Sequence, residues 1–283
     1  MSGEFEILIV GGDKRMQMLG KILTERGYYC IRENRDFSTA LSLLDKARVV
    51  VLPIPVSKDG INIFSDNTEF RLSLTDVFNT LKSGQIVVSG GISGKYCENL
   101  EGNGVHCFNL NNCEEFTVYN AYLTAQGALK LLLDNTQSYV NGKYVLVTGF
   151  GRVAKALCAA LKGLNMHIIV AARNRVQLCE AECMGYKTIY KDNISNDVFM
   201  FDYIFNTIPY PVFSKDDIRM FKKGCIYFEL ASHPYGASAE DFISENKKYV
   251  PAPALPGKYT AYSAAEKIAD YFEFVYKRGE THG

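Results

Sequence analysis

The 283-residue chain lacks the features that mark several large classes of protein. Its 31 basic residues balance its 31 acidic residues, and no run of like charge is longer than a triplet, so the composition does not favour a broad nucleic-acid-binding surface. No apolar stretch approaches the length needed to span a bilayer. Residues 1–6 lack the basic and apolar regions of a secretory signal peptide. We expect neither nucleic acid nor a membrane among its partners.

The eight cysteines include no Cys-x-x-Cys pair. Cys179 and Cys183 stand one helical turn apart, but no histidine or second cysteine pair accompanies them, so a metal site is not predicted. Scattered thiols of this kind indicate a reducing compartment, and we expect a cytoplasmic protein. With 47% hydrophobic and 22% charged residues, the chain has enough apolar side chains for two domains of ordinary size.

What the chain does have is a dinucleotide-binding pattern just past its midpoint. The apolar run Tyr144–Thr148 leads into Gly149–Ala154, which has the G-x-G-x-x-A form, and the apolar run His167–Ala172 follows at the spacing of a βαβ unit. In such a unit the first glycine permits a tight turn and the second lets the backbone approach a pyrophosphate. The residues expected to contact the cofactor are Gly149, Phe150, Gly151, Arg152 and Val153.

Arg173 indicates which dinucleotide to expect. A site for NAD usually has Asp or Glu at the end of the second strand to bind the ribose 2′-hydroxyl, whereas an arginine suits the 2′-phosphate of NADP. Residues 171–175 include two arginines and no carboxylate. The sequence therefore favours NADP, with the alternative that Arg173 and Arg175 are ordinary solvated charges at the start of a helix.

Strands and helices alternate throughout, which predicts two α/β domains with parallel sheets. The predicted strands are 5–10, 28–31, 48–52, 85–89 and 105–108 in the first block, and 144–148, 167–171, 187–190, 203–205 and 225–230 in the second. A long helical pattern from Asn120 links the blocks, and a last helix covers about 263–276. We expect a substrate or partner domain over 1–118, an NADP-binding domain over 119–283 that includes both of these helices, and a cleft between two Rossmann-like domains.

Polar residues after the predicted strands are candidates for a substrate site, because loops that follow parallel strands share one edge of the sheet. Arg15 and Gln17 follow the first strand and Ser89 ends the fourth, where side chains and free N–H groups are able to bind a carboxylate. The alternatives are an N-cap at Asp13 with a solvated first turn, and a plain tight turn after Ser89. Lys258 precedes the last helix and is expected to face the cleft.

In the second domain, two predicted strand ends lie beside the expected nicotinamide position. Asn206 and Thr207 are candidates to orient the carboxamide, Pro209 stiffens their loop, and Ser232 follows the next strand. Of the four histidines, only His233 is expected at this edge, which makes it the candidate for proton transfer. A structural or merely exposed histidine is the alternative.

Several short motifs occur in a characteristic order along the chain. They are Gly11–Arg15, Thr124–Ala128, Gly149–Arg152, Ala172–Arg173, Asn206–Pro209, Leu230–Ser232 and Leu255–Lys258. In order and spacing they resemble the A-subunit family of dipicolinate synthase, a sporulation enzyme of Firmicutes. The resemblance implies a formate/glycerate-dehydrogenase-like architecture, NADP, and oxidation of dihydrodipicolinate or its hydrated precursor to dipicolinate in the mother cell. It also implies that the partner is a flavoprotein B subunit, and it is compatible with a homo-oligomer.

Within that resemblance, Arg15 and Lys258 are expected to bind the two carboxylates of a cyclic substrate, one as a fork and one as a point charge. Either His233 or water accepts the ring proton. Two other functions remain open on the sequence: another NADP-linked oxidoreductase of the alanine- or hydroxyacid-dehydrogenase type, and a non-catalytic subunit that binds NADPH.

Overall fold

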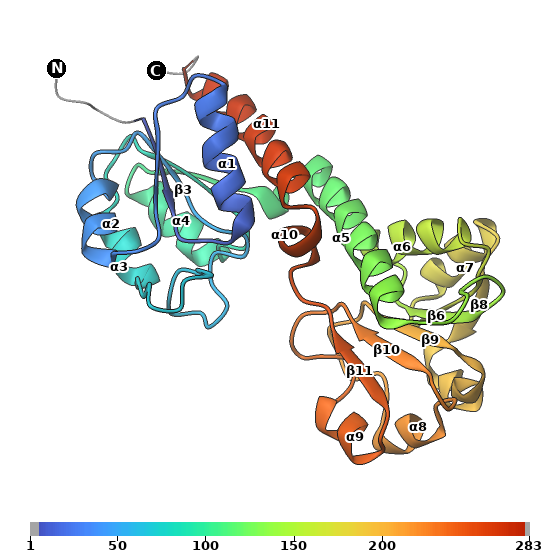
Figure 1. The fold of residues 1–283 in the computed structure, drawn as a ribbon. Helices are drawn as coiled ribbons and strands as arrows, with labels where there is room; N and C mark the ends of the chain where they lie inside the picture. Colours follow the sequence, from blue (N-terminus) through green and yellow to red (C-terminus); the bar gives the residue numbers. More distant parts are fainter. Residues whose placement is uncertain (1–5, 281–283) are drawn as a thin grey trace. The chain divides into compact units, whose positions relative to one another are not determined.

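The computed structural model describes residues 6–280 and divides the chain into two compact units (Figure 1). Unit 1 contains the chain up to Tyr119 together with the residues from Thr260 on, and unit 2 contains Asn120–Tyr259. Helix α5 (Glu114–Asn135) carries the chain from the first unit into the second.

Unit 1 is built on a five-stranded parallel sheet of order β2-β1-β3-β4-β5. Its elements are β1 (Ile7–Val10), α1 (Lys14–Glu25), β2 (Cys30–Glu33), α2 (Phe37–Leu44), β3 (Val49–Val51), α3 (Leu74–Thr80), β4 (Ile86–Ser89), α4 (Gly94–Gly102), β5 (His106–Asn109), the 3-10 turn η1 (Leu110–Asn112) and α11 (Ala261–Glu280). Strands β1, β3 and β4 are buried along their whole length, which is why their sequences are apolar without alternation. Because the strand order reverses beside β1, the loops after β1 and β3 lie where open sheets of this kind bind ligands.

Helix α11 packs beside α1 on one face of this sheet (Figure 1). Ile268 and Phe272 of α11 are buried in the same cluster as Leu19 of α1, and the Phe272 ring meets Tyr28 edge-on with centroids 5.4 Å apart. The expected domain division differs from this finding, since it placed the last helix with the cofactor domain. The physical reason is the apolar face of α11, which completes the core of unit 1.

Unit 2 is built on a six-stranded parallel sheet of order β11-β10-β9-β6-β7-β8. Its elements, besides most of α5, are β6 (Tyr144–Thr148), α6 (Arg152–Lys162), β7 (His167–Ala172), α7 (Arg175–Cys183), β8 (Lys187–Tyr190), the 3-10 turns η2 (Lys191–Asn196) and η3 (Val198–Met200), β9 (Tyr203–Asn206), α8 (Lys215–Met220), β10 (Ile226–Glu229), α9 (Ala239–Ser244), β11 (Lys248–Pro251) and α10 (Leu255–Tyr259). In chain order this is the 3-2-1-4-5-6 arrangement of Rossmann domains. The prediction of two parallel-sheet α/β domains is confirmed.

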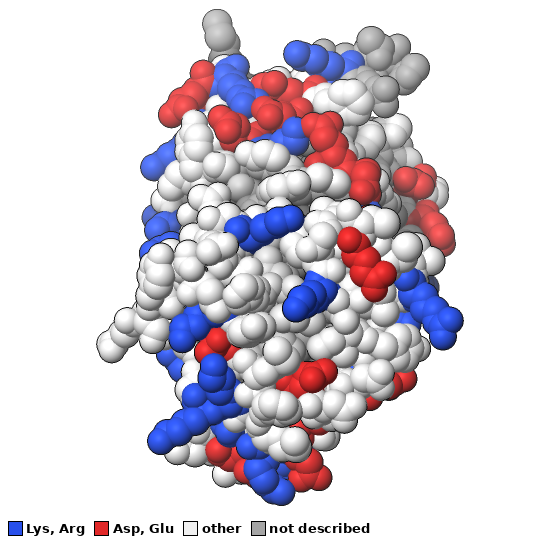
Figure 2. Space-filling model, turned by 90° about the vertical axis from the view of Figure 1, so that its right-hand side faces the viewer, with Lys and Arg blue, Asp and Glu red and all other residues white. Residues whose placement is uncertain are grey.

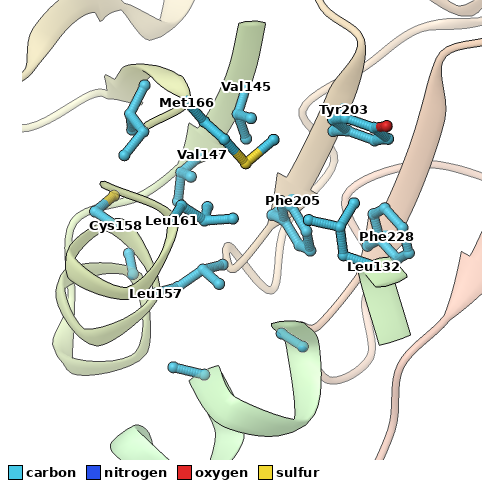
Figure 3. Packing of buried hydrophobic residues seen from close by; sticks show 14 of the residues in the cluster. Leu132, Val145, Val147, Leu157, Cys158, Leu161, Met166, Tyr203, Phe205 and Phe228 are labelled. Atoms are coloured by element: carbon cyan, nitrogen blue, oxygen red, sulfur yellow. The ribbon is translucent and has the colours of Figure 1, made fainter. Parts of the chain in front are cut away.

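The core of unit 2 holds α6 against the sheet (Figure 3). Leu157 and Leu161, one helical turn apart, are buried with Val147 of β6 in a single apolar cluster. In the same cluster Phe205 and Phe228 stack with ring centroids 4.6 Å apart, a contact that typically adds about 0.5–1.5 kcal/mol beyond area burial. This packing fixes the start of α6 relative to the end of β6, and therefore fixes the fingerprint loop between them.

Charged side chains of both signs are interspersed with uncharged ones on the face shown in Figure 2. Within residues 6–280, no helix combines the length and apolarity needed to cross a membrane. Over the same part of the chain, His, Cys, Asp and Glu side chains do not gather in threes that could hold a metal ion.

Candidate functional site

The two fingerprint glycines have different reasons to be glycine. Gly149 follows β6 with a φ of +83°, and a Cβ built on it lies 2.7 Å from Thr207 Oγ1 and 3.1 Å from Ile208 Cγ1, so the fold itself requires glycine here. Gly151 has a φ of −84°, is exposed, and a Cβ built on it meets no atom within 4 Å. Neither backbone geometry nor packing explains Gly151. The open space before it therefore fits a group that approaches closely from outside, such as a pyrophosphate.

The start of α6 supplies the polar groups for such a ligand. Gly151 is the N-cap and makes no side-chain cap hydrogen bond, so the N–H groups of the first turn and the positive end of the helix dipole face the open space. Phe150 is 1% exposed, and its ring packs edge-on against Tyr186 with centroids 6.0 Å apart. Its side chain thus anchors the loop in the core. Arg152 is exposed in the first turn and Val153 is half-buried.

Arg173 lies directly after β7, the strand that neighbours β6. Its side chain is exposed and makes no hydrogen bond or ion pair with any residue that the structure describes. The next residue, Asn174, caps α7 by accepting a hydrogen bond from Val176 N at 2.8 Å. Arg173 therefore precedes a helix start and has no ion-pair partner among the described residues, which suits a phosphate ligand.

Asn206, at the end of β9, is placed differently from expectation. It is fully buried, and its Nδ2 donates to Glu229 Oε1 at 2.6 Å and to Ile208 O at 2.9 Å, while its Oδ1 accepts from Thr148 Oγ1 at 2.5 Å. Both N–H groups of the amide are used inside the protein. Asn206 therefore orders the loop that follows it, and the expectation that its amide orients a carboxamide is corrected.

The other candidates of unit 2 lie on the surface of the same strand ends. Thr207 is half-buried and donates from Oγ1 to Thr148 O at 2.6 Å. Pro209, Ser232 and His233 are exposed in the loops after β9 and β10. These loops and the Gly149–Gly151 turn all follow neighbouring strands at one edge of the sheet, so the structure brings the predicted cofactor residues together. Lys258 is exposed in α10.

The candidates of unit 1 are tied to the loop after β3. Arg15 is 5% exposed and donates to both carboxylate oxygens of Asp13, with Nη2–Oδ2 at 2.8 Å, and also to Ile54 O. Ser89 is fully buried and donates from Oγ to Pro53 O at 3.1 Å, so its hydroxyl is not exposed for a substrate. Gln17 is exposed on the first turn of α1. The structure brings Arg15 and Ser89 to one edge as expected, but both side chains stabilise the neighbouring loop.

Sequence reasoning missed Glu229, the last residue of β10. Burial raises the pKa of this carboxyl, while hydrogen bonds from Asn206, Tyr227 and two backbone N–H groups lower it by a smaller amount. The available signal was an acidic residue inside the otherwise apolar strand predicted over 225–230, where a solvated charge is not expected.

Comparison with known proteins shows what the chain is similar to. Residues 6–111 match the family model of the N-terminal domain of the dipicolinate synthase A-subunit. The match covers 106 of the 283 residues, all of them in unit 1. Over 94% of this chain and 93% of the relative, the sequence is 24% identical to the dipicolinate synthase A-subunit of Bacillus subtilis (strain 168). The resemblance that the motifs indicated is confirmed.

Solved structures support the fold of the whole chain. The dipicolinate synthase A-subunit from Bacillus halodurans matches with a TM-score of 0.80 and 20% identity, covering 97% of this chain and 98% of that one. D-lactate dehydrogenase from Salmonella matches with a TM-score of 0.66 and 11% identity, covering 95% and 96% of the two chains. At these identities the matches establish the fold alone, which consists of two Rossmann-like α/β domains with parallel sheets.

Proposed function

We propose that this chain is an NADP-dependent oxidoreductase that oxidises dihydrodipicolinate, or its hydrated precursor, to dipicolinate in a sporulating cell, with a flavoprotein as its partner. The observation that carries the proposal is the open space at Gly151, present in a chain whose first unit matches the family model of the N-terminal domain of the dipicolinate synthase A-subunit. A dinucleotide site joined to such a domain supports a redox reaction on a dicarboxylate.

The residues of unit 2 fit the cofactor by their chemistry. The N–H groups at the start of α6 would bind the pyrophosphate, and Arg173 would bind the 2′-phosphate of the adenosine ribose. When bound, NADP supplies the hydride acceptor. Thr207, Pro209 and Ser232 would then line the nicotinamide end, where Thr207 is held by its hydrogen bond to Thr148 O.

In unit 1, the chain offers Arg15 for one substrate carboxylate. Its Nε and Nη2 are used by Asp13 and Ile54, which leaves Nη1 as the nitrogen able to meet a ligand. Gln17 stands exposed on the same helical turn. In unit 2, Lys258 is an exposed cation that would suit a carboxylate. His233 is the candidate to accept the ring proton, with water as the alternative acceptor. The protein's main contribution is then to hold the ring in position for hydride transfer.

Turnover of freshly generated dihydrodipicolinate with NADP, with and without a flavoprotein partner, tests the reaction. We expect NADPH to appear in at least one of the two mixtures. NADPH binding without turnover in either mixture would refute the enzyme and favour a non-catalytic protein that binds NADPH. Turnover of an amino or hydroxy acid but not of dihydrodipicolinate would favour the alternative class of dehydrogenase.

The choice of NADP over NAD is tested by Arg173→Ala, with Arg175→Ala as the matched control on the same exposed segment. Hydrogen bonds to charged groups contribute about 1.5–3 kcal/mol, so losing Arg173 should weaken NADPH binding roughly 10- to 100-fold and leave NADH binding nearly unchanged. Arg175→Ala should change neither. If Arg173→Ala keeps the wild-type preference for NADPH, the 2′-phosphate assignment is wrong.

A further inference from the structure

Glu229 lies in a row of polar side chains that crosses three neighbouring strands. Thr148 at the end of β6 pairs in register with Asn206 of β9, and Asn206 pairs with Glu229 of β10. All three side chains are buried, with Glu229 only 2% exposed, and hydrogen bonds join them from Thr148 Oγ1 through the Asn206 amide to Glu229 Oε1. The row ends directly beneath the loops that follow these strands.

Four donors surround the Glu229 carboxylate. Oε1 accepts from Asn206 Nδ2 at 2.6 Å and from Ala231 N at 3.1 Å, and Oε2 accepts from Tyr227 Oη and from Gly236 N, both at 2.8 Å. A carboxylate that receives two donors on each oxygen is fully satisfied without a cation. Tyr227 and Tyr249 are titratable groups near this carboxylate, whose charge helps to raise the pKa of both phenols.

The two backbone donors mark the ends of one loop. Ala231 N and Gly236 N bind the same carboxylate, so the residues between them, including Ser232 and His233, form an exposed arc closed by Glu229. Gly236 fits this closure only as glycine, because a Cβ built on it lies 2.3 Å from Asn206 Nδ2 and 2.7 Å from Tyr227 Oη. The backbone at Gly236 thus packs directly against the side chains of Asn206 and Tyr227.

We propose that Glu229 is the positioning residue of the active site. It fixes the 231–236 loop directly and, through Asn206, the loop after β9. Ser232 and His233 are thereby positioned at the reacting end of the cofactor. This inference rests on the proposed function for the identity of the reaction. Glu229 itself touches neither substrate nor cofactor, because its carboxylate is buried beneath the loops that it holds.

The test compares Glu229→Gln with Glu240→Gln, an exposed glutamate in α9. A glutamine places an NH₂ where Glu229 accepts two hydrogen bonds, so at least one loop N–H loses its acceptor. We expect kcat to fall roughly 10- to 100-fold, while Kd for NADPH, set by α6 and Arg173, changes less than about 3-fold. Glu240→Gln should match the wild type. An unchanged kcat in Glu229→Gln would overturn the assignment. An equal loss of kcat and of affinity for NADPH would also overturn it, because Glu229 would then have a merely structural role.

The pH profile provides a readout that a general loss of stability does not move. Protonation of Glu229 removes acceptor capacity, so wild-type kcat should fall as the pH drops through the raised pKa of this carboxyl. Tyr227 and Tyr249 stay neutral in that range, because burial raises the pKa of both phenols. The acidic limb should be absent from Glu229→Gln. A limb that is identical in the two proteins contradicts the proposal.

Two further measurements keep the inference independent of folding and of turnover. If Glu229→Gln does not fold, Tyr227→Phe deletes one of the four donors, and unchanged kcat in that variant overturns the proposal. If the wild type turns over no substrate, the proposed reaction fails, but NMR of the His233 ring still decides the loop. NADPH should shift its signal in the wild type and not in Glu229→Gln, and an equal shift in both would overturn the positioning role.

Discussion

Replacing Gly151 by alanine should remove cofactor binding and leave the fold intact. The added Cβ meets no atom within 4 Å, and a φ of −84° is open to any residue, so the free energy of unfolding should change by less than about 1 kcal/mol. The same Cβ projects into the space assigned to the pyrophosphate. Displacing the phosphate from a single charged hydrogen bond removes about 1.5–3 kcal/mol, which corresponds to roughly 10- to 100-fold weaker binding of NADPH.

Gly149→Ala is the matched control, because it makes the same chemical change two residues earlier. A non-glycine residue at a φ of +83° costs about 1–2 kcal/mol. Its Cβ also lies 2.7 Å from Thr207 Oγ1, whose hydrogen bond to Thr148 O contributes about 1 kcal/mol. Gly149→Ala should therefore lower the free energy of unfolding by about 2–3 kcal/mol in total.

Urea unfolding followed by circular dichroism measures the free energy of unfolding of each variant. Fluorescence titration measures its affinity for NADPH. The chain has no tryptophan, so bound NADPH can be detected without energy transfer from that side chain. Wild-type affinity in Gly151→Ala would show that the open space is not the pyrophosphate position. If Gly151→Ala destabilises the protein as much as Gly149→Ala does, the distinction between the two glycines is wrong.

Four further predictions concern burial and charge. Phe272→Ala empties a buried site between α11 and the core of unit 1, so it should lower the free energy of unfolding by about 3–5 kcal/mol in urea titrations. NADPH should still bind unit 2. Unchanged stability would contradict the packing of α11. Arg15→Ala should raise KM or abolish turnover without changing Kd for NADPH, and loss of both would assign Arg15 to folding alone. Burial raises the pKa of Cys158 and Cys225 to about 12, so about one of these thiols in ten thousand is ionised at pH 8. Alkylation of the native protein, read by mass spectrometry, should therefore label exposed Cys183 far sooner than the two buried cysteines. Because the unfolded chain ionises these thiols first, stability should decline as the pH rises from 9 towards 12, and Cys158→Ala with Cys225→Ala should reduce that decline.

The sequence predicts the fold where the pattern is local and strong. The apolar runs that form β1, β3 and β4 are buried on both faces and have few alternative interpretations. Strand β2 is predicted at 28–31 but spans Cys30–Glu33, because the charged Arg32 and Glu33 hide its end at the sheet edge. Strand β11 (Lys248–Pro251) is missed, since a short edge strand that ends in proline carries little pattern. Helix α5 begins at Glu114, earlier than the expected Asn120, with two glutamates in its first turn.

The candidate site is predictable in its glycines and in Arg173, because each obeys a rule of spacing. The roles of Asn206 and Ser89 cannot be predicted in this way, because they depend on the direction of a side chain at the end of a strand. Both side chains point into the core. Glu229 closes its loop by accepting a hydrogen bond from the backbone N–H of Gly236, seven positions later. A pattern of residue types cannot predict such a bond, because every residue except proline has a backbone N–H.

The return of α11 to unit 1 has a consequence for how the protein is made. A ribosome-bound chain that has reached Tyr259 already contains every strand of unit 2, whereas the first sheet still lacks the helix that covers β1 and β3. We expect the later-synthesised unit to be complete before the earlier one. Until α11 is synthesised, part of the apolar face of unit 1 would stay uncovered. A nonsense mutation just before the codons of α11 would thus damage unit 1, whose strands are synthesised first, while leaving every strand of unit 2 in place.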